Sequence, residues 1–303
     1  MKNFTEQCKK YPVWGWAGMV LVAVFWPMNW FLPGTRSMYA FFPLWLGYIL
    51  IVDGMVFLRS NTSQINRNVR GFVFLFCTSA PFWWLFEILN RRVQNWHYLG
   101  VENLNTIEYF LMATINFSVV IPAVFESSEL ASTFKWVKPI FINIRIQKSG
   151  RTAVLSLLTG IVMLTVLLIW PKYFFPFMWL SIYFIVEPVN FWLGTSGLYD
   201  FLEKKDWRPV LCLFVGVLVT GFFWECWNYY SYPKWIYTVP YVNFAKIFEM
   251  PAPGYLGYLP FSLELCALFQ FINGFSRIKN TGIIPVFERV FTESGQEPVK
   301  LEQ

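Results

Sequence analysis

Glu87 and Glu225 stand out in an otherwise apolar sequence as residues that could carry out acid-base chemistry. Each lies in a run of apolar residues and is followed three positions later by an asparagine, Asn90 or Asn228. In a helix, that spacing places the amide one turn from the carboxyl group. Carboxylic acids in apolar surroundings stay protonated at neutral pH and can then donate the proton. The Glu-x-x-Asn motif therefore predicts two proton donors, each oriented by an amide.

Two further glutamates follow at matching positions. Glu126 and Glu264 have the same separation along the chain as Glu87 and Glu225, and each comes at the fourth position after a proline. The matches continue with Asn90 and Asn228, Pro122 and Pro260, Arg70 and Arg208, and, one position further apart, Trp96 and Trp235, and Tyr98 and Tyr237. The chain is therefore predicted to be a tandem duplication.

A third pair of acids, Asp53 and Glu187, ends two similar apolar segments whose separation is slightly shorter than that of the other pairs. A charged side chain at the centre of a bilayer costs about 2.5 to 3.5 kcal/mol on insertion scales. Hydrogen bonds between membrane helices average about 0.6 kcal/mol, so a purely structural role is the alternative for any single acid. Six acids in apolar segments favour a functional set.

Tryptophans flank the motif glutamates, with Trp84 before Glu87, and Trp224 and Trp227 on either side of Glu225. Aromatic faces attract cations, and the attraction is stronger where water is excluded. Acids beside aromatic walls suit the protonation of a carbon–carbon double bond and the stabilisation of the carbocation that results.

The composition predicts a membrane protein, because 56% of residues are hydrophobic, 14% are charged and the mean hydropathy is +0.45. A bilayer-spanning helix needs about 20 mostly apolar residues. Eight segments qualify, over residues 14–32, 38–58, 70–89, 110–132, 152–170, 173–194, 208–228 and 251–275.

The positive charges predict the orientation of these spans. With Arg70 and Arg208 counted beside their spans, the nine segments outside the membrane hold 3, 1, 3, 2, 5, 1, 3, 2 and 4 Lys plus Arg residues. Cytoplasmic loops accumulate such residues, so both termini should be cytoplasmic, in a bacterial inner membrane. The net charge of +6 is dispersed over loops, which argues against nucleic-acid binding.

The predicted fold class is an all-α integral membrane protein of two four-helix repeats, over residues 1–134 and 152–276. A basic cytoplasmic linker, 135–151, joins them, and 277–303 form a cytoplasmic tail. Because each repeat has an even number of spans, a pseudo-twofold axis should run along the membrane normal. The outward loops at 91–106 and 229–250 carry Trp and Tyr suited to the headgroup level, and the second, rich in proline, should re-enter the membrane or pack on the bundle.

Cofactor motifs are not evident in the sequence. The single histidine, His97, lies in an outer loop, and the five cysteines form no C-x-x-C pair, so neither a metal site nor a disulfide framework is indicated. A Gly-rich nucleotide loop is also lacking. The expected chemistry is independent of cofactors and metals.

The two proline-bearing segments resemble the membrane-integral lycopene cyclases of the heterodimeric and fused type. They run from Val120 through Pro122 to Glu126 and from Gly257 through Pro260 to Glu264. That family also has paired homologous halves and aromatic-rich spans. The resemblance implies cyclisation of a polyene end group, with one carboxylic acid protonating the chain and a second carboxylate removing a proton.

Two functions remain open. The first is an isomerase-type enzyme for an isoprenoid, carotenoid-like or other lipid, and the second is a proton- or cation-coupled transporter or channel that uses the same acids. A non-catalytic lipid-binding scaffold is a third possibility. The predicted catalytic residues are Glu225, Glu264, Glu87 and Glu126. The predicted substrate-binding residues are Asn90, Asn228, Trp84, Trp224, Trp227, Asp53, Glu187, Arg70 and Arg208.

Overall fold

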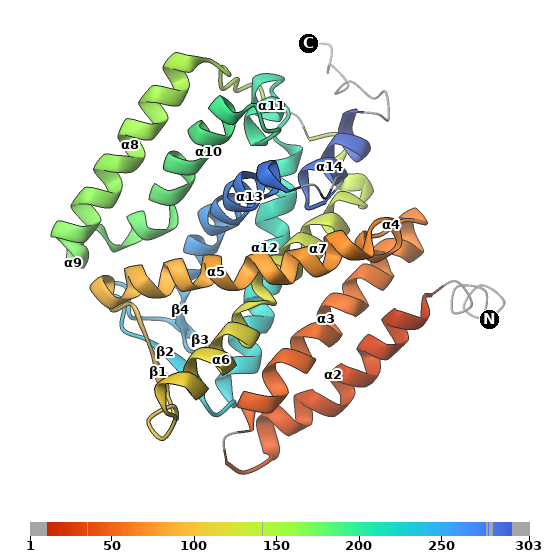
Figure 1. Ribbon diagram of the computed structural model, residues 1–303, viewed down its shortest axis with the longest axis vertical. Helices are drawn as coiled ribbons and strands as arrows, with labels where there is room; N and C mark the ends of the chain where they lie inside the picture. The colour runs from red at the N-terminus through yellow and green to blue at the C-terminus, as the bar shows by residue number, and fades with distance from the viewer. Residues whose placement is uncertain (1–10, 35, 141, 277, 279–280, 293–303) are drawn as a thin grey trace.

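The first half of the chain is mostly helical. A computed structural model describes residues 11–34, 36–140, 142–276, 278 and 281–292 (Figure 1). The elements up to the linker are α2 (Val13–Phe31), α3 (Ser37–Ser60), α4 (Gln64–Arg67), α5 (Val69–Val93), β1 (Trp96–Leu99), α6 (Thr106–Phe117), α7 (Val120–Ser132) and η1 (Lys135–Val137).

The second half begins with α8 (Gly150–Ile169) and has a comparable order of long elements. It continues with α9 (Pro171–Phe174), η2 (Phe175–Trp179), α10 (Ser181–Leu193), α11 (Leu198–Glu203), α12 (Arg208–Tyr229), β2 (Lys234–Tyr237), β3 (Lys246–Ile247), β4 (Met250–Pro251), η3 (Ala252–Gly257) and α13 (Tyr258–Phe275). The fold is thus mostly helical, with short strands in the loops.

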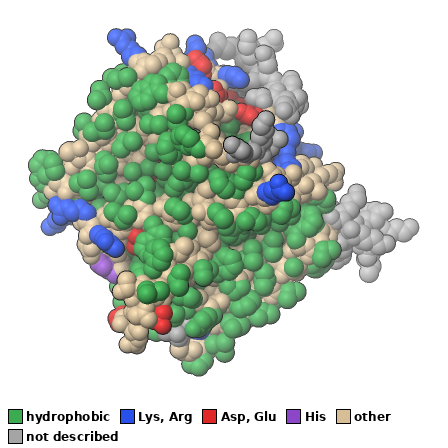
Figure 2. Space-filling view, viewed as in Figure 1, with side chains coloured by type: hydrophobic (Ala, Val, Ile, Leu, Met, Phe, Trp, Pro, Cys, Tyr) green, Lys and Arg blue, Asp and Glu red, His purple; other side chains and the backbone are tan. Residues whose placement is uncertain are grey.

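Helices occupy all eight ranges predicted from the sequence, but fewer of them have the length and composition of a membrane span. Six do so on their own, and the bent pair formed by 171–179 and α10 would make seven. Val13–Phe31 is not among them. Apolar side chains cover most of the face in Figure 2, and Lys and Arg gather towards its edges. These features define a helical membrane protein.

The helices pack in matching pairs within and between the two halves. Within the halves, α2 packs on α3 and α8 on α10, while α3 contacts α7 and α10 contacts α13. Between the halves, α12 packs on α7, and α5 contacts α13. The short helices α4, α11 and α14 lie at one end of the molecule, and the four strands lie at the other (Figure 1).

The strands β1 and β2 join the two outer loops in an antiparallel ribbon. Trp96 pairs with Tyr237 and Tyr98 pairs with Trp235, with His97 opposite Ile236 between them and Leu99 opposite Lys234 at the end. The second loop packs on the bundle, where Met250 is buried. The sequence placed the loop Trp and Tyr residues at the headgroup level. Trp96 is 5% exposed within the protein, and a carboxyl group on α5 accepts its indole N–H.

Part of the segment expected to be a cytoplasmic tail is packed into the core. The helix α14 (Ile284–Phe287) and the π-helical turn η4 (Glu288–Thr292) follow α13. Ile283, Ile284, Val286, Phe287 and Phe291 are buried in the main hydrophobic cluster. Residues 293–303 of that prediction, like the first ten residues of the chain, lie outside the described residues.

Helices α2 and α3 approach closely because glycines face one another. A Cβ atom on Gly18 would lie 2.7 Å from the backbone oxygen of Gly47, and one on Gly47 would lie 2.9 Å from the oxygen of Gly18. Small residues allow such backbone contact between membrane helices, where van der Waals packing is a main source of association.

We predict that Gly18→Leu separates α2 from α3 and destabilises the protein by about 1 to 3 kcal/mol, as overpacking usually does. Thermal unfolding in detergent measures the effect. Val20→Leu is the control, because Val20 lies on the same helix and is 62% exposed. Equal melting temperatures for the two variants would contradict the close packing.

Candidate functional site

Glu87 accepts three hydrogen bonds from aromatic side chains on a single oxygen. Its Oε1 atom accepts from Trp83 Nε1 at 2.9 Å, from Trp96 Nε1 at 3.0 Å and from the Tyr98 hydroxyl at 2.6 Å. Trp83 is one turn earlier on α5, whereas Trp96 and Tyr98 come from β1. The loop therefore folds back so that its aromatic residues satisfy the carboxyl group.

Glu225 has an analogous arrangement in the second half of the chain. Its Oε1 atom accepts from the hydroxyls of Tyr237 and Tyr258, each at 2.7 Å, and Tyr237 accepts from Trp235 Nε1 at 2.9 Å. The Glu225 side chain is fully buried, and its Oε2 atom has no hydrogen-bond partner within the described part of the chain. One oxygen of this carboxyl group is thus unsatisfied.

The donors to both carboxyl groups line the same cavity, which has a volume of about 170 Å³. Tyr98 belongs to the Glu87 set, and Tyr237 and Tyr258 belong to the Glu225 set. The cavity lining is dominated by aromatic and other apolar residues and comprises Met38, Phe41, Trp83, Trp96, Tyr98, Val101, Leu104, Tyr109, Met112, Ala113, Asn116, Phe117, Val120, Trp179, Trp224, Pro233, Lys234, Trp235, Tyr237, Met250 and Tyr258. Phenol hydroxyls thus connect the two carboxyl groups to the cavity.

The phenols on the two strands are held in their protonated form. Burial, reinforced by the neighbouring Glu87 carboxyl group, raises the pKa of Tyr98 well above its usual value. Burial and the Glu225 carboxyl group have the same effect on the pKa of Tyr237. Both hydroxyls therefore serve as hydrogen-bond donors at neutral pH.

Asn90 and Asn228 position the strands that carry these aromatic residues. Asn90 Nδ2 donates to the backbone oxygen of Trp96 at 2.8 Å, and its Oδ1 accepts from Asn95 N at 2.9 Å. Asn228 Nδ2 donates to the oxygen of Trp235 at 2.8 Å, and its Oδ1 accepts from Trp235 N at 2.9 Å. The prediction that these amides orient the carboxyl groups is wrong, because the folded-back loops supply backbone groups that bond them instead.

The ring that approaches each glutamate from the bundle side comes from a different helix in each half. In the first half it is Trp83 on α5, and the duplication places Gly221 at the corresponding position of α12. In the second half it is Tyr258 on α13, and the corresponding residue of α7 is Val120. A Cβ on Gly221 would lie 2.6 Å from Tyr258 Cε2, so this glycine makes room for the tyrosine.

Glu264 and Glu126 do not line the cavity. Glu264 is fully buried, and its Oε1 accepts from Ile182 N, near the start of α10, at 3.1 Å. Helix N-termini favour negative side chains, so this contact stabilises α10. Glu126 is 1% exposed, and neither of its oxygens has a hydrogen-bond partner in the regions that the structure describes.

Asp53 and Glu187 hold loops in place. Asp53 Oδ2 accepts from Ile65 N at 3.0 Å, and Glu187 Oε1 accepts from Tyr199 N at 3.3 Å. Both donors are the second residue of a short helix, α4 or α11. Asp53 Oδ1 also accepts from Trp14 Nε1 at 2.7 Å. Neither acid lines the cavity, and their contacts fit a purely structural role, in which each acid holds a loop in place.

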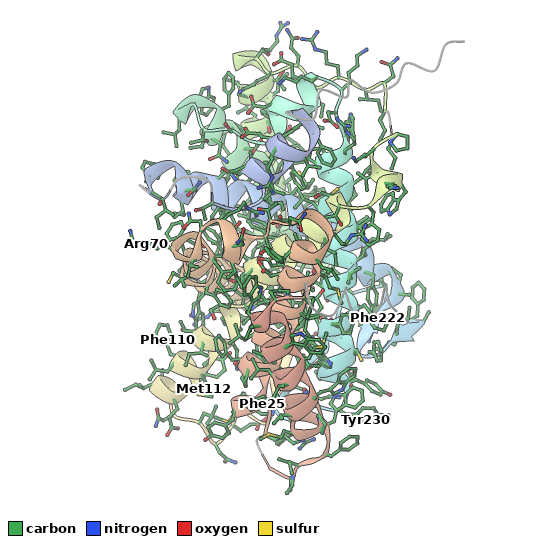
Figure 3. The ribbon with its side chains drawn as sticks, turned by 90° about the vertical axis from the view of Figure 1, so that its right-hand side faces the viewer. Phe25, Arg70, Phe110, Met112, Phe222 and Tyr230 are labelled. Atoms are coloured by element: carbon green, nitrogen blue, oxygen red, sulfur yellow. The ribbon has the colours of Figure 1, made fainter. Side chains whose placement is uncertain are left out.

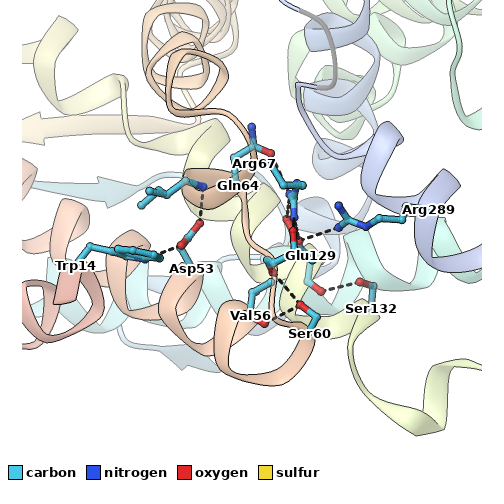
Figure 4. Close-up of polar contacts among 11 residues, drawn as sticks. Trp14, Asp53, Val56, Ser60, Gln64, Arg67, Glu129, Ser132 and Arg289 are labelled. Atoms are coloured by element: carbon cyan, nitrogen blue, oxygen red, sulfur yellow. Dashed lines mark hydrogen bonds and ion pairs between the residues drawn. The ribbon is translucent and has the colours of Figure 1, made fainter. Parts of the chain in front are cut away.

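A cluster of charged residues lies near Asp53, at the α4 end of the molecule (Figure 4). Arg67 donates to both carboxylate oxygens of Glu129, each at 2.7 Å. Arg289 lies 3.5 Å from Glu129 Oε1. The bidentate pair fixes α4 to α7, and Arg289 adds the C-terminal segment.

The remaining predicted substrate-binding residues divide into one that lines the cavity and four that do not. Trp224 is a lining residue. Trp84 donates to Thr114 Oγ1 at 3.0 Å, and Trp227 packs against Trp45 in the core. Arg70 is exposed at the outer surface (Figure 3), and Arg208 pairs with the adjacent Asp206.

Tyr258 and Asn116 are lining residues that the sequence reasoning missed. Tyr258 is two positions before the repeated Pro260, but its counterpart Val120 carries no hydroxyl, so the duplication did not mark it. Tyr98 and Tyr237 were marked by the duplication and assigned to the membrane surface. No signal in the sequence singles out Asn116.

Among the described residues, no group of three or more His, Cys, Asp and Glu side chains could hold a metal ion. His97 Nε2 lies 2.9 Å from Thr238 Oγ1, in the loop after β2. No family model, curated protein or solved structure matches the chain.

We predict that Gly221→Ala displaces Tyr258 and weakens its bond to Glu225, because the new methyl group overlaps the ring. In a Tyr258→Val background, the same substitution should cost at least about 0.5 kcal/mol less, since the ring is gone. Unfolding of the wild type, the two single variants and the double variant in detergent measures the coupling. Additive effects would contradict it.

We predict that Tyr98 and Tyr237 ionise later than an ordinary tyrosine, whose pKa is about 10. Because the raised pKa favours the neutral phenol in the folded protein, this contribution to stability is complete below about pH 10 and is lost as pH rises through the raised value. Ultraviolet titration of Tyr98→Phe and Tyr237→Phe should show the same phenolate absorbance as the wild type below about pH 11. A smaller amplitude in either variant would contradict the assignment.

Proposed function

We propose that this protein is a membrane-embedded enzyme that performs acid-base chemistry, either isomerisation or cyclisation, on the end group of a hydrophobic lipid. The observation that carries the proposal is the aromatic cavity whose hydroxyl groups connect it to two carboxyl groups, Glu87 and Glu225. No metal or cofactor is required for a reaction in which one proton is added and another is removed.

The size of the cavity supports a reaction on an end group. An apolar protein cavity of about 150 Å³ holds one benzene molecule, so about 170 Å³ accommodates one ring or a short branched chain end. The remainder of a lipid would extend past α6. Ala113 and Phe117 on that helix line the cavity, whereas Ile107, Phe110 and Ile115 are exposed on it. Figure 3 shows the outward position of Phe110.

The proposed reaction uses the two sides of the cavity in different roles. Tyr258 gives its hydroxyl proton to a carbon of a double bond, and a protonated Glu225 restores it. The aromatic walls, which include Trp224 and Trp179, stabilise the cation. Tyr98 then takes a proton from a neighbouring carbon and passes its own to Glu87, which begins as the carboxylate. Loss of a proton from Glu87 and uptake of one by Glu225 restore both acids before the next turnover. The substrate gains and loses one proton, so its mass and oxidation state do not change.

We also propose that the chain has eight spans in two repeats related by a pseudo-twofold axis, with both termini cytoplasmic in a bacterial inner membrane. The duplication relates Trp96 to Trp235 and Tyr98 to Tyr237, so the pairing of Trp96 with Tyr237 and of Tyr98 with Trp235 is symmetric about such an axis. The matching helix contacts of the two halves also support it. Under this proposal α2 is a span that α3 and α12 shield in part.

The resemblance to lycopene cyclases is compatible with this chemistry but differs in the residues that would perform it. Glu126 and Glu264 follow the prolines that carry the resemblance, yet the cavity is served by Glu87 and Glu225. We therefore propose a polyene or related isoprenoid as one suitable substrate class, with the acid-base roles assigned to the Glu-x-x-Asn glutamates.

Proton transport is a second candidate because of one specific observation. Glu126 is buried with both oxygens unpaired among the described residues and lies on the same helix as Glu129, which is bonded to Arg67. A buried acid inside a membrane bundle is a common part of a proton relay. A continuous polar path through the bundle would favour this candidate, whereas the aromatic lining of the cavity favours the enzyme.

We predict that Glu225→Gln abolishes formation of a lipid product in cells that express the protein, because glutamine cannot supply a proton. Lipid mass spectrometry of cells expressing the wild type, a variant or no protein identifies the product as an isomer of its precursor. In membranes incubated in D₂O, the wild-type product should gain one deuterium at carbon. Tyr258→Phe should reduce the yield at least about tenfold, in the range of general acid-base catalysis.

Two control variants separate this outcome from loss of folding. Glu264→Gln should keep activity if folded, because Glu264 does not line the cavity, and Glu203→Gln changes an acid in an exposed ion pair with Arg145. Full activity in Glu225→Gln would overturn the assignment. Proton flux into vesicles that stops in Glu126→Gln would support the transport candidate instead.

A further inference from the structure

We propose that Asn116 recognises a hydroxyl group on the end group of the substrate, which makes the preferred ligand a neutral lipid alcohol. This inference rests on the proposed function of the cavity and specifies the chemistry of its ligand. It starts from the polar atoms of the lining, several of which already have partners in the protein.

Five other polar groups of the cavity are hydrogen-bonded within the protein. The hydroxyls of Tyr98, Tyr237 and Tyr258 donate to the two glutamates, and the indoles of Trp83 and Trp96 donate to Glu87. These groups shape the acid-base relay and keep their bonds to the protein in the resting site.

The side-chain amide of Asn116 differs from these groups in its hydrogen bonding. It is on the last turn of α6, close to Ala113 and Phe117, which are also lining residues. Its Oδ1 atom is buried and has no hydrogen-bond partner among the described residues, and no other lining residue of the cavity has such an atom. Buried polar groups are normally paired, so an unpaired amide at an apolar cavity indicates a ligand group that pairs with it.

A hydroxyl group fits this amide in either of its orientations. Turning the amide over exchanges its carbonyl oxygen and its NH₂ group, which differ little in shape. A hydroxyl both donates and accepts, so it can bond whichever group faces it. Recognition therefore does not depend on which end of the amide points into the cavity.

The charge at the cavity favours a neutral ligand over an anionic one. Lys234 is the basic lining residue, and it is paired with Glu249. Its Nζ also donates to the backbone oxygen of Tyr229 at 3.1 Å. Because the positive charge is already compensated, a phosphate or carboxylate would find no unpaired cation among the lining residues, whereas an alcohol requires none.

The test compares two probes that differ by one hydroxyl group. Geraniol and the hydrocarbon with the same carbon skeleton are titrated into the full-length protein in nanodiscs, with empty nanodiscs as the correction for partition into lipid. Quenching of tryptophan fluorescence reports binding, since Trp83, Trp96, Trp179 and Trp235 line the cavity. The wild type should bind geraniol about tenfold more tightly, the effect of one hydrogen bond in an apolar site.

Asn116→Leu and Asn116→Ala should both lose this preference while still binding the hydrocarbon. Asn273→Leu is the matched control, because Asn273 also has a buried, unpaired Oδ1 among the described residues but does not line the cavity, and it should keep the preference. Equal affinity of the wild type for both probes, as expected if the amide binds only water, would overturn the inference and leave the proposed function standing. Failure of both probes to bind would overturn both.

Discussion

A carboxyl group placed inside an apolar helical bundle must find hydrogen-bond donors, and much of this structure follows from how that need is met. Glu225 is fully buried and Glu87 is half-buried, and no arginine or lysine pairs with either in the described structure. Aromatic N–H and O–H groups from β1, β2 and α13 bond to them instead. The outer loops fold back over the bundle for that reason, and the cavity forms where the two loops meet.

A second consequence is that acids in similar sequence surroundings have different hydrogen-bond partners in the structure. Asp53, Glu187 and Glu264 accept backbone N–H groups near helix starts and so organise loops. Glu126 has no such partner in the described structure because its surroundings differ: the helix that matches α10 in the first half, α3, is continuous and offers no free N–H groups there. The acids that serve the cavity are those that bond to phenols.

The sequence was informative where periodicity and duplication carried the signal, and less so where long-range geometry decided. Helix positions followed from apolar runs, and the Glu-x-x-Asn spacing marked the two glutamates that bond to the cavity phenols. The partners of Asn90 and Asn228 could not be predicted, because they are backbone atoms brought back by a loop. Tyr258 was missed because the two halves place equivalent rings on different helices, and α14 was missed because a short, mixed segment has little periodicity.

The ribbon of β1 and β2 links the two sides of the cavity. Each strand carries the phenol of one carboxyl group, and the two strands are hydrogen-bonded to each other around His97 and Ile236. A ligand that pushes Tyr98 outward also pulls on Tyr237, since the ladder joins the two strands that carry them. The ribbon therefore couples the two sides of the cavity, and a displacement on one side also moves the phenol that bonds to the acid on the other side.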